Sequence, residues 1–125
     1  MKGKSKKEGV NSKERIKKKS QFVSIFKNGK KIDIKKLKIF YAKNNINISR
    51  FTIVTSKKLG SSVQRNRIKR IIKEVYRRNK EYFGKNMDWI FIPQGKWEKI
   101  NYHDTERFLL DVIKGIEKKK KGLEK

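Results

Sequence analysis

Cysteine is absent from the chain, and proline and histidine each occur only once. Without cysteine there can be no disulfide framework and no cysteine-ligated zinc site. The single histidine, His103, excludes a two-histidine acid–base mechanism within one chain. The apolar stretch from Trp89 to Ile92 is far too short to span a bilayer. Disulfide-stabilised secreted domains, zinc fingers and membrane-spanning proteins are therefore excluded.

Acidic residues are also scarce, with 12 of them against 37 lysines and arginines, which gives a formal net charge of +25. Repulsion among this many positive charges would be relieved by a polyanionic partner, so we expect one. Binding to an anionic membrane would need an apolar or amphipathic anchor beside the basic cluster. No apolar segment follows the lysine-rich amino terminus, as a secretory signal would require. We therefore expect a cytoplasmic protein whose partner is nucleic acid, with no membrane partner.

The side chains that a protein nuclease needs are not arranged for catalysis. Metal-dependent hydrolysis requires clustered carboxylates, but Asp33, Glu74 and Asp88 are scattered among lysines. The segment from Lys57 to Ser62 lacks the spaced glycines of a phosphate-cradling loop, although it presents backbone amides where a helix begins. We predict no catalytic residue and no metal site in this chain.

The length of 125 residues fits one compact domain with basic ends. Residues 1–18 contain few aliphatic side chains and are predicted to form a disordered basic arm. The domain itself is expected over residues 19–117, and residues 118–125 are expected to form a basic, solvated tail. A short first helix would be capped by Ser20 and would end at Asn28-Gly29, with Phe22, Ile25 and Phe26 at helical spacing.

β-branched and aromatic residues dominate residues 32–42 and 50–56, and asparagines mark a turn between them. These two segments predict an antiparallel hairpin, with room for a short extra strand at residues 32–34. A compact apolar run from Met87 to Ile92, stopped by Pro93, predicts a buried strand.

A longer helix is expected from Ser61 to about Lys80, because its apolar residues recur at helical spacing. They are Ile68, Ile71, Ile72, Val75 and Tyr76. Two further helices are expected after the last strand: a brief turn at residues 96–100 and a longer helix capped by Asp104. The inner face of the longer helix would consist of Phe108, Leu109, Val112, Ile113 and Ile116. This order of elements predicts an α+β sandwich with one mixed sheet.

The expected helix over residues 61–80 is basic on the side opposite its apolar stripe. At about 100° per residue, Asn66, Arg70, Lys73 and Arg77 fall opposite the apolar stripe, with Arg67 and Lys69 flanking them. Charged helix faces are usually only solvated, but here Glu74 is the one acidic residue between Arg65 and Lys80. A one-sided cationic face on a protein of this charge predicts nucleic-acid binding, without separating RNA from DNA.

Two segments give this basic helix a specific resemblance. They read Ser56-Lys57-Lys58-Leu59-Gly60 and Arg65-Asn66-Arg67-Ile68-Lys69-Arg70. Together they resemble the signature of the bacterial ribonuclease P protein family. The likeness extends to Phe22, Val23, Ile25, Phe26, Lys27 and Gly29, which resemble the first helix of the family, and to residues 51–55, which resemble its third strand. It covers residues from about 15 to 118.

The resemblance implies an α-β-β-β-α-β-α-α sandwich with one mixed four-stranded sheet and an uncommon left-handed βαβ crossover. It also implies that the chain is the non-catalytic subunit of an endoribonuclease. In that family the RNA subunit removes the 5′ leader of precursor tRNA by a hydrolysis that depends on Mg2+, which the RNA mainly binds. The implied partners are ribonuclease P RNA and precursor tRNA, with no small-molecule cofactor.

Residue roles follow from the same resemblance. Five residues match the basic motif of the family, which is placed near the catalytic RNA: Arg65, Asn66, Arg67, Lys69 and Arg70. We assign Lys58 and Lys73, from their position beside this motif, to the same RNA. Phe22, Phe26 and Phe40 match aromatic residues of the cleft that holds the single-stranded leader, and Lys57 is assigned to the same cleft. Either lysine of the Lys57-Lys58 pair nevertheless suits either RNA. The sequence Pro93-Gln94-Gly95 follows the fourth strand where the family commonly has a basic residue, so a phosphate contact is expected to be missing or to come from Lys96.

Three other classes share some of these features. A ribosomal protein would have the same charge and basic tails, but the compact motif from Arg65 to Arg70 together with the Phe22 and Phe26 helix is not explained by charge. In a helix-turn-helix protein a partner helix would precede the basic helix, whereas a strand is expected there. A self-sufficient nuclease lacks the acid–base groups it would need.

Overall fold

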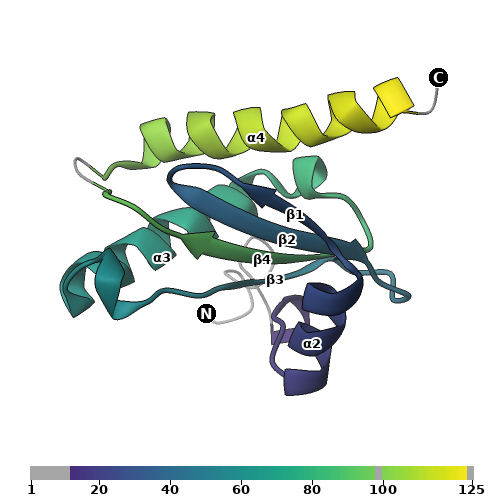
Figure 1. The fold of residues 1–125 in the computed structure, drawn as a ribbon, viewed down its shortest axis with the longest axis horizontal. Coiled ribbons are helices and arrows are strands. Elements are labelled where there is room, and N and C mark those ends of the chain that lie inside the picture. Colours follow the sequence, from purple (N-terminus) through teal and green to yellow (C-terminus); the bar gives the residue numbers. More distant parts are fainter. Residues whose placement is uncertain (1–11, 98–99, 124–125) are drawn as a thin grey trace, which may run out of the picture.

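The computed structural model describes residues 12–97 and 100–123. Within this part of the chain three α-helices and four strands follow one another in the order shown in Figure 1. The helices are α2 (Lys19–Asn28), α3 (Ser62–Arg78) and α4 (Tyr102–Leu123), and the strands are β1 (Lys30–Asp33), β2 (Leu37–Lys43), β3 (Arg50–Ile53) and β4 (Met87–Pro93). Short 3-10 helices lie at Ser12–Glu14, Lys57–Leu59 and Lys80–Phe83. The predicted α+β class with one mixed four-stranded sheet is confirmed.

The order of strands in the sheet is β1-β2-β4-β3, with β3 parallel to β4 and the other pairs antiparallel. The predicted hairpin between residues 32–42 and 50–56 is therefore wrong, because β4 lies between β2 and β3. Residues Asp88 to Phe91 of β4 are all buried, so this strand needs neighbours on both edges and cover on both faces. The tight hairpin is instead the one that joins β1 to β2.

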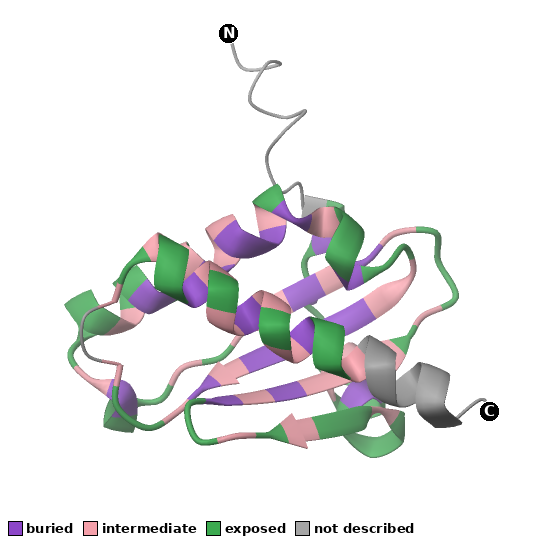
Figure 2. Ribbon diagram, turned by 90° about the horizontal axis from the view of Figure 1, so that it is seen from above, coloured by how far each residue is buried: buried purple, intermediate pink, exposed green. Residues whose placement is uncertain are grey.

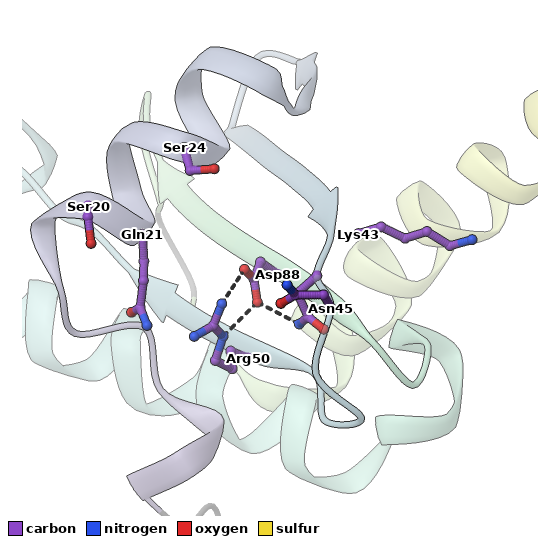
Figure 3. A pocket seen from close by; sticks show the side chains of 8 residues that line it. Ser20, Gln21, Ser24, Lys43, Asn45, Arg50 and Asp88 are labelled. Atoms are coloured by element: carbon purple, nitrogen blue, oxygen red, sulfur yellow. Dashed lines mark hydrogen bonds and ion pairs between the residues drawn. The ribbon is translucent and has the colours of Figure 1, made fainter.

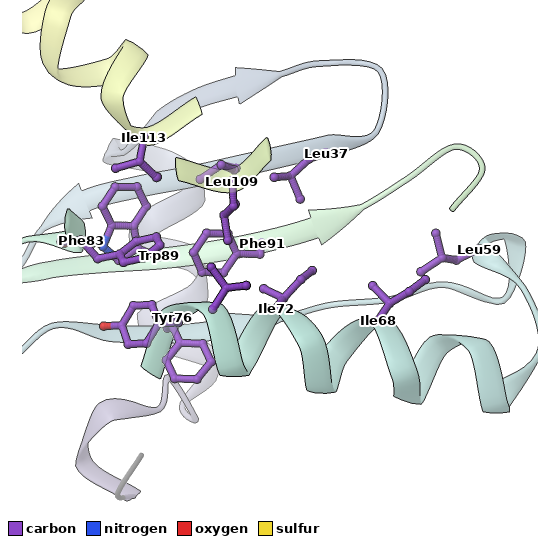
Figure 4. Packing of buried hydrophobic residues seen from close by; sticks show 13 residues of the cluster. Leu37, Leu59, Ile68, Ile72, Tyr76, Phe83, Trp89, Phe91, Leu109 and Ile113 are labelled. Carbon is purple, nitrogen blue, oxygen red and sulfur yellow. Dashed lines mark hydrogen bonds between the residues drawn. The ribbon is translucent and has the colours of Figure 1, made fainter. Parts of the chain in front are cut away.

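The two faces of the sheet are covered unequally. Helices α3 and α4 pack on one face, over a core that includes Leu37 and Ile39 of β2 and Phe91 of β4 (Figure 4). Helix α2 packs on the other face (Figure 1), over a small cluster of Ile25 and Ile90. Figure 2 is seen from the α4 side, and exposed and buried residues alternate along that helix. Because successive strand residues point to opposite faces, the odd-numbered residues of β2 and β4 face α3 and α4, and the even-numbered ones face α2.

Helix α3 forms as its sequence predicts. The Ser61 hydroxyl accepts the backbone N–H of Gln64 at 3.2 Å, and the Gln64 side chain accepts the backbone N–H of Ser61 at 3.1 Å. This capping box fixes the first turn. Gly60, just before it, has φ +150, and a Cβ atom there would lie 2.3 Å from the Gln64 side-chain oxygen. Four residues of the predicted stripe are buried, and Ile71 is partly buried.

The amino ends of the other two helices differ from expectation. Ser20 does not cap α2, which begins at Lys19; the Gln21 side-chain oxygen instead accepts the backbone N–H groups of Lys17 and Lys18. Asp104 does not cap α4 either, because the Asn101 side chain accepts the backbone N–H of Asp104 at 2.8 Å. In both cases the side-chain oxygen of a neighbouring amide residue, Gln21 or Asn101, accepts the backbone N–H groups at the start of the helix.

The described part of the expected disordered arm, residues 12–18, is packed against the domain. The Ile16 backbone N–H donates to the Phe51 oxygen at 3.1 Å, and the Ile16 side chain is buried beside Ile25. The Glu14 carboxylate lies 2.9 Å from the Lys80 ammonium group. A backbone hydrogen bond, a buried isoleucine and an ion pair together dock this segment at the edge of β3. Residues 1–11 of the expected arm lie outside the described residues.

The carboxy-terminal end also differs from the prediction. One long helix, α4, takes the place of the expected pair, and the described residues of the predicted turn at 96–100 are not helical. Residues 98 and 99 lie outside the described part of the chain. The backbone of residues 118–123, expected as a tail, continues α4, and residues 124–125 are not described. The predicted inner face of α4 is confirmed, since Leu109 and Ile113 are buried.

Candidate nucleic-acid interface

The outward side of α3 carries a set of polar and basic side chains that we call the basic ridge. It consists of Arg65, Asn66, Arg67, Lys69, Arg70 and Lys73. Arg65 and Lys73 are partly exposed, and the other four are exposed. Within residues 12–97 and 100–123, none of the six makes a side-chain hydrogen bond or an ion pair. Their donors are free for a ligand.

The carboxy-terminal end of the same helix is different. Arg77 and Arg78 both donate to the carboxylate of Glu74, with Nε–O distances of 3.0 Å in each pair. These contacts, the hydrogen bond from Arg77 first, lower the pKa of Glu74 below its usual value. Glu74, the one acidic residue of α3, is thus paired with the two arginines at the carboxy-terminal end of the helix. No carboxylate of α3 therefore neutralises the basic ridge.

Lys57 and Lys58 lie in the 3-10 helix that connects β3 to α3 (Figure 1). Both side chains are exposed, whereas the following residue, Leu59, is buried in the main core. Leu59 therefore anchors the corner while the two lysines face solvent beside the first turn of α3. Their cationic groups extend the basic ridge toward the end of β3.

Phe22, Phe26 and Phe40 form a second candidate surface, which we call the aromatic cluster. The ring centroids of Phe26 and Phe40 are 4.7 Å apart in an edge-to-face arrangement, and those of Phe22 and Phe26 are 6.5 Å apart. Phe22 and Phe40 are partly buried against Ile25 and Ile90, but Phe26 is 45% exposed. The cluster packs against the small core on one side and is open to solvent on the other, as bases stacking on its rings would require.

The structure does not bring the two surfaces together. The basic ridge belongs to a helix on one face of the sheet, and the aromatic cluster lies on the opposite face, between α2 and β2. Lys57 and Lys58 stand at the end of the sheet, where the connection to α3 begins. An RNA that contacts both surfaces must therefore pass around an end or an edge of the sheet.

Two basic residues beside the aromatic cluster were not anticipated from the sequence. Lys31 Nζ lies 5.9 Å from the centroid of the Phe40 ring, and Lys38 is on the same face of β2 as Phe40. The signal that could have found them is the alternation along β1 and β2. Lys31, Lys38 and Phe40 occupy every second position, interleaved with Ile32, Leu37 and Ile39.

A polar pocket of about 540 Å³ lies on the other flank of α2 (Figure 3). Its floor is the ion pair between Arg50 and Asp88, which is bidentate, with N–O distances of 2.9 and 2.7 Å. Asn44 donates a further hydrogen bond of 2.9 Å to the same carboxylate. The hydrogen bond to Asp88 also raises the pKa of Arg50. The carboxylate is satisfied by these partners, so this pocket offers no free base.

No described part of the chain provides a metal centre or a membrane span. Within residues 12–97 and 100–123, histidine, aspartate and glutamate side chains nowhere gather in threes at a distance that could hold a metal ion. His103 is exposed on the first turn of α4, next to the Tyr102 ring. Among the same residues, no helix has the length and apolar character needed to cross a bilayer.

Comparison with known proteins gives one consistent family. The sequence profile described as Ribonuclease P matches residues 10–117. The ribonuclease P protein component of Thermotoga maritima is 32% identical over 114 residues, covering 88% of this chain and 97% of the relative. That of Clostridium botulinum is 38% identical over 101 residues, covering 80% of this chain and 91% of the relative.

Solved structures agree with the sequence comparison. The RNase P protein from Thermotoga maritima superposes with a TM-score of 0.72 at 31% identity, covering 81% of this chain and 96% of that one. The RNase P protein of Staphylococcus aureus gives the same TM-score and identity, covering 81% and 93% of the two chains. The fold described above is therefore the fold of these proteins.

Proposed function

The chain belongs to the ribonuclease P protein family, and from this premise we propose that it is the RNA-binding subunit that assists a catalytic RNA. Membership makes it a component of an endoribonuclease of tRNA 5′ processing. In our proposal the RNA subunit performs the hydrolysis that removes the 5′ leader of precursor tRNA in the cytoplasm. The protein binds both the catalytic RNA and the leader.

The observation that carries this proposal is the unpaired basic ridge. Five cations, together with Asn66, project from one helix with no described carboxylate to neutralise them. Because these side chains form no ion pairs within the described protein, their N–H donors are available to phosphate oxygens. Arginine can bind a phosphate with two parallel hydrogen bonds. Asn66 can both donate to and accept from a ribose hydroxyl or a base edge. We assign the ridge and Lys58 to the catalytic RNA.

The aromatic cluster suits the leader. A leader is single-stranded, so its unpaired bases can stack on exposed rings, and stacking is tolerant of base sequence. Phe26 offers the most open ring, and Phe40 supports it from the sheet. Lys57, at the end of the same sheet, is assigned to leader phosphates. The domain over residues 19–117 carries these assignments, and residues 12–18 are added to it because they dock on β3.

Mg2+ belongs to the RNA part of the enzyme in this proposal. The described residues contain no group of carboxylates and histidines that fits a divalent ion. The buried carboxylate of Asp88 is already bonded to Arg50 and Asn44. The side chains of residues 12–97 and 100–123 therefore do not fit a protein-held metal, and no catalytic step is assigned to them. Their contribution is cationic charge, which reduces the repulsion between two polyanions.

Cleavage of a precursor tRNA by the partner RNA at low Mg2+, with and without the protein, tests the proposal. The protein should lower the Mg2+ concentration that cleavage requires, and it should cut nothing by itself. A lysine-rich peptide of equal net charge controls for simple neutralisation and should help less than the folded protein.

Two results would contradict this function. One is an unchanged Mg2+ requirement when the protein is added to its RNA. The other is robust cleavage by RNA-free protein in the presence of ribonuclease inhibitors, which would return catalysis to the protein chain.

A further inference from the structure

Four polar and aromatic side chains share one small area of the sheet face that α2 leaves open. In the β1–β2 register, Lys31 is opposite Phe40 and Asp33 is opposite Lys38. Residues directly opposite one another point to the same face of an antiparallel pair. Lys31, Asp33, Lys38 and Phe40 therefore project together, on the side of the sheet that carries the aromatic cluster.

The two lysines are held loosely around one carboxylate. Asp33 Oδ2 lies 3.8 Å from Lys31 Nζ and 3.9 Å from Lys38 Nζ, whereas the buried pair of Arg50 and Asp88 has an N–O distance of 2.7 Å. About half of the Lys31 and Asp33 side chains is exposed. Exposed ion pairs of this length contribute little to stability, so they do not explain why two lysines converge here.

Asp33 itself is fixed from the neighbouring loop. The Gln94 side-chain amide donates to Asp33 Oδ1 at 2.9 Å and to the Ile34 oxygen at 2.7 Å. The Gln94 backbone N–H donates to the Lys36 oxygen at 2.9 Å. The turn between β1 and β2 is thus tied to the end of β4, and the carboxylate between the lysines has a defined position.

We propose that Lys31 and Lys38 together bind one backbone phosphate of the single-stranded RNA that leaves the aromatic cluster at the β1 edge of the sheet. Asp33 is the positioning residue: it holds the two ammonium groups near each other and, by its own charge, limits how tightly they bind. The lysine pair with Asp33 has a net charge of one positive unit, enough for a weak, reversible contact. The proposal rests on the proposed function of the aromatic cluster.

The distance to Phe40 supports this assignment. Lys31 Nζ lies 5.9 Å from the Phe40 ring centroid, and Lys38 is two residues before Phe40 on the same strand. A nucleotide stacked on Phe26 or Phe40 carries its phosphate at the edge of the ring, and the next phosphate lies one nucleotide farther along. Aromatic platforms flanked by cations are the usual arrangement for single-stranded RNA, because stacking and backbone neutralisation act on the same nucleotide.

The test compares full-length variants assembled with the partner RNA. The ligands are precursor tRNAs whose leaders lengthen by one nucleotide at a time, together with leaderless tRNA. With the parental protein, affinity should rise when the leader becomes long enough to pass Phe40. The double variant Lys31→Ala/Lys38→Ala should lose that last rise, about tenfold for one charge-assisted contact, and keep the affinity for short leaders.

The matched control is Lys43→Ala/Lys85→Ala, which removes the same charge from the opposite end of the sheet and should keep the rise. The salt dependence provides a second measure: the log–log slope for long leaders should fall in magnitude by about 0.7 in the lysine variant. Asp33→Asn keeps an amide partner for the lysines and removes the opposing charge, so it should strengthen binding of long leaders about two- to threefold.

The proposal is overturned if the lysine variant matches the control, or if it weakens leaderless and long-leader ligands equally, which would assign the pair to another RNA surface. It is also overturned if Asp33→Asn weakens binding while a thermal melt shows an intact fold. A failure of the proposed function looks different, since then even short leaders would bind no better than leaderless tRNA.

Discussion

The two faces of the sheet use phenylalanine in opposite ways. On the face covered by α3 and α4, Phe51, Phe83 and Phe91 are each at most 2% exposed and pack in a network with Tyr76. On the face covered by α2, Phe26 is 45% exposed and lies beside the rings of Phe22 and Phe40. The same residue type is a core element on one face and an open platform on the other.

The difference follows from how much helix covers each face. Helices α3 and α4 span 17 and 22 residues, and together they close one side of the sheet. Helix α2 has 10 residues and buries only Ile25. On this face Asp88 and Ile90 of β4 are buried, but Lys38 and Phe40 of β2 are only partly buried, so apolar and basic side chains remain accessible there. One face supplies stability, and the other remains free to bind.

The largest expected effect is on the face of the sheet that α3 and α4 cover, which we call the closed face. Phe91→Ala should reduce the free energy of unfolding by about 3 to 5 kcal/mol, because it opens a cavity among rings that have no room to collapse. Urea denaturation followed by circular dichroism measures this loss. A loss below that of Phe26→Ala would contradict the distinction between the two faces.

The next effect concerns the outer side of α3, which we propose binds RNA, whereas its inner side packs in the core. Arg65→Ala/Arg67→Ala/Arg70→Ala should weaken binding of the partner RNA and leave the melting temperature unchanged, because these side chains have no described partner. Each lost phosphate contact should reduce the magnitude of the log–log salt slope by about 0.7 to 0.9. The slope is obtained from binding titrations at several salt concentrations.

An equal-charge control for this variant is Lys43→Ala/Lys85→Ala/Lys114→Ala, which should keep most of the affinity. Unfolding of the arginine variant would show that the ridge is structural. Binding with the parental slope would mean that the ridge is only a solvated helix face.

A smaller effect, selective for leader-bearing RNA, is expected on the face that α2 covers only in part, which we call the open face. Phe26→Ala should weaken binding of leader-bearing precursor tRNA by about 1 to 3 kcal/mol, the usual contribution of one stacked base, and leave mature tRNA almost unaffected. Phe22→Ala should combine this effect with a loss of stability, because Phe22 is partly buried against Ile25. Paired binding assays and thermal melts separate the two contributions. Equal weakening for both ligands, together with a large melting loss for Phe26→Ala, would place the cluster in the core.

The smallest effect is a pH dependence that belongs to the closed face alone. Burial raises the pKa of Tyr76 above its ordinary value of 10.0, so the folded state keeps the hydroxyl neutral while the unfolded chain can ionise it. This contribution to stability is complete below pH 10.0 and is lost as the pH rises further. Tyr76→Phe should therefore show a shallower loss of stability than the parent across alkaline pH. Parallel slopes in denaturation experiments would contradict the assignment.

Local patterns were enough for α3 and β4. The capping pair Ser61 and Gln64, the apolar stripe and the run ended by Pro93 each depend on residues close in sequence, so their periodicity predicts both type and buried side. The basic ridge follows from the same helical geometry. The resemblance to the ribonuclease P protein family, now confirmed, also came from contiguous residues. The handedness of the connection through α3 stays a prediction.

Charge and periodicity in the sequence were enough to predict an α+β domain with a basic helix and a polyanionic partner. Only the tertiary structure decided which strands are neighbours, because β4 pairs with residues far away in the chain and excludes the hairpin that adjacency suggested. Docking of Ile16 on β3 and the meeting of Lys31 with Lys38 were decided in the same way. Periodicity fixes which side of an element is apolar, whereas long-range packing fixes what lies against that side and what stays open to a ligand.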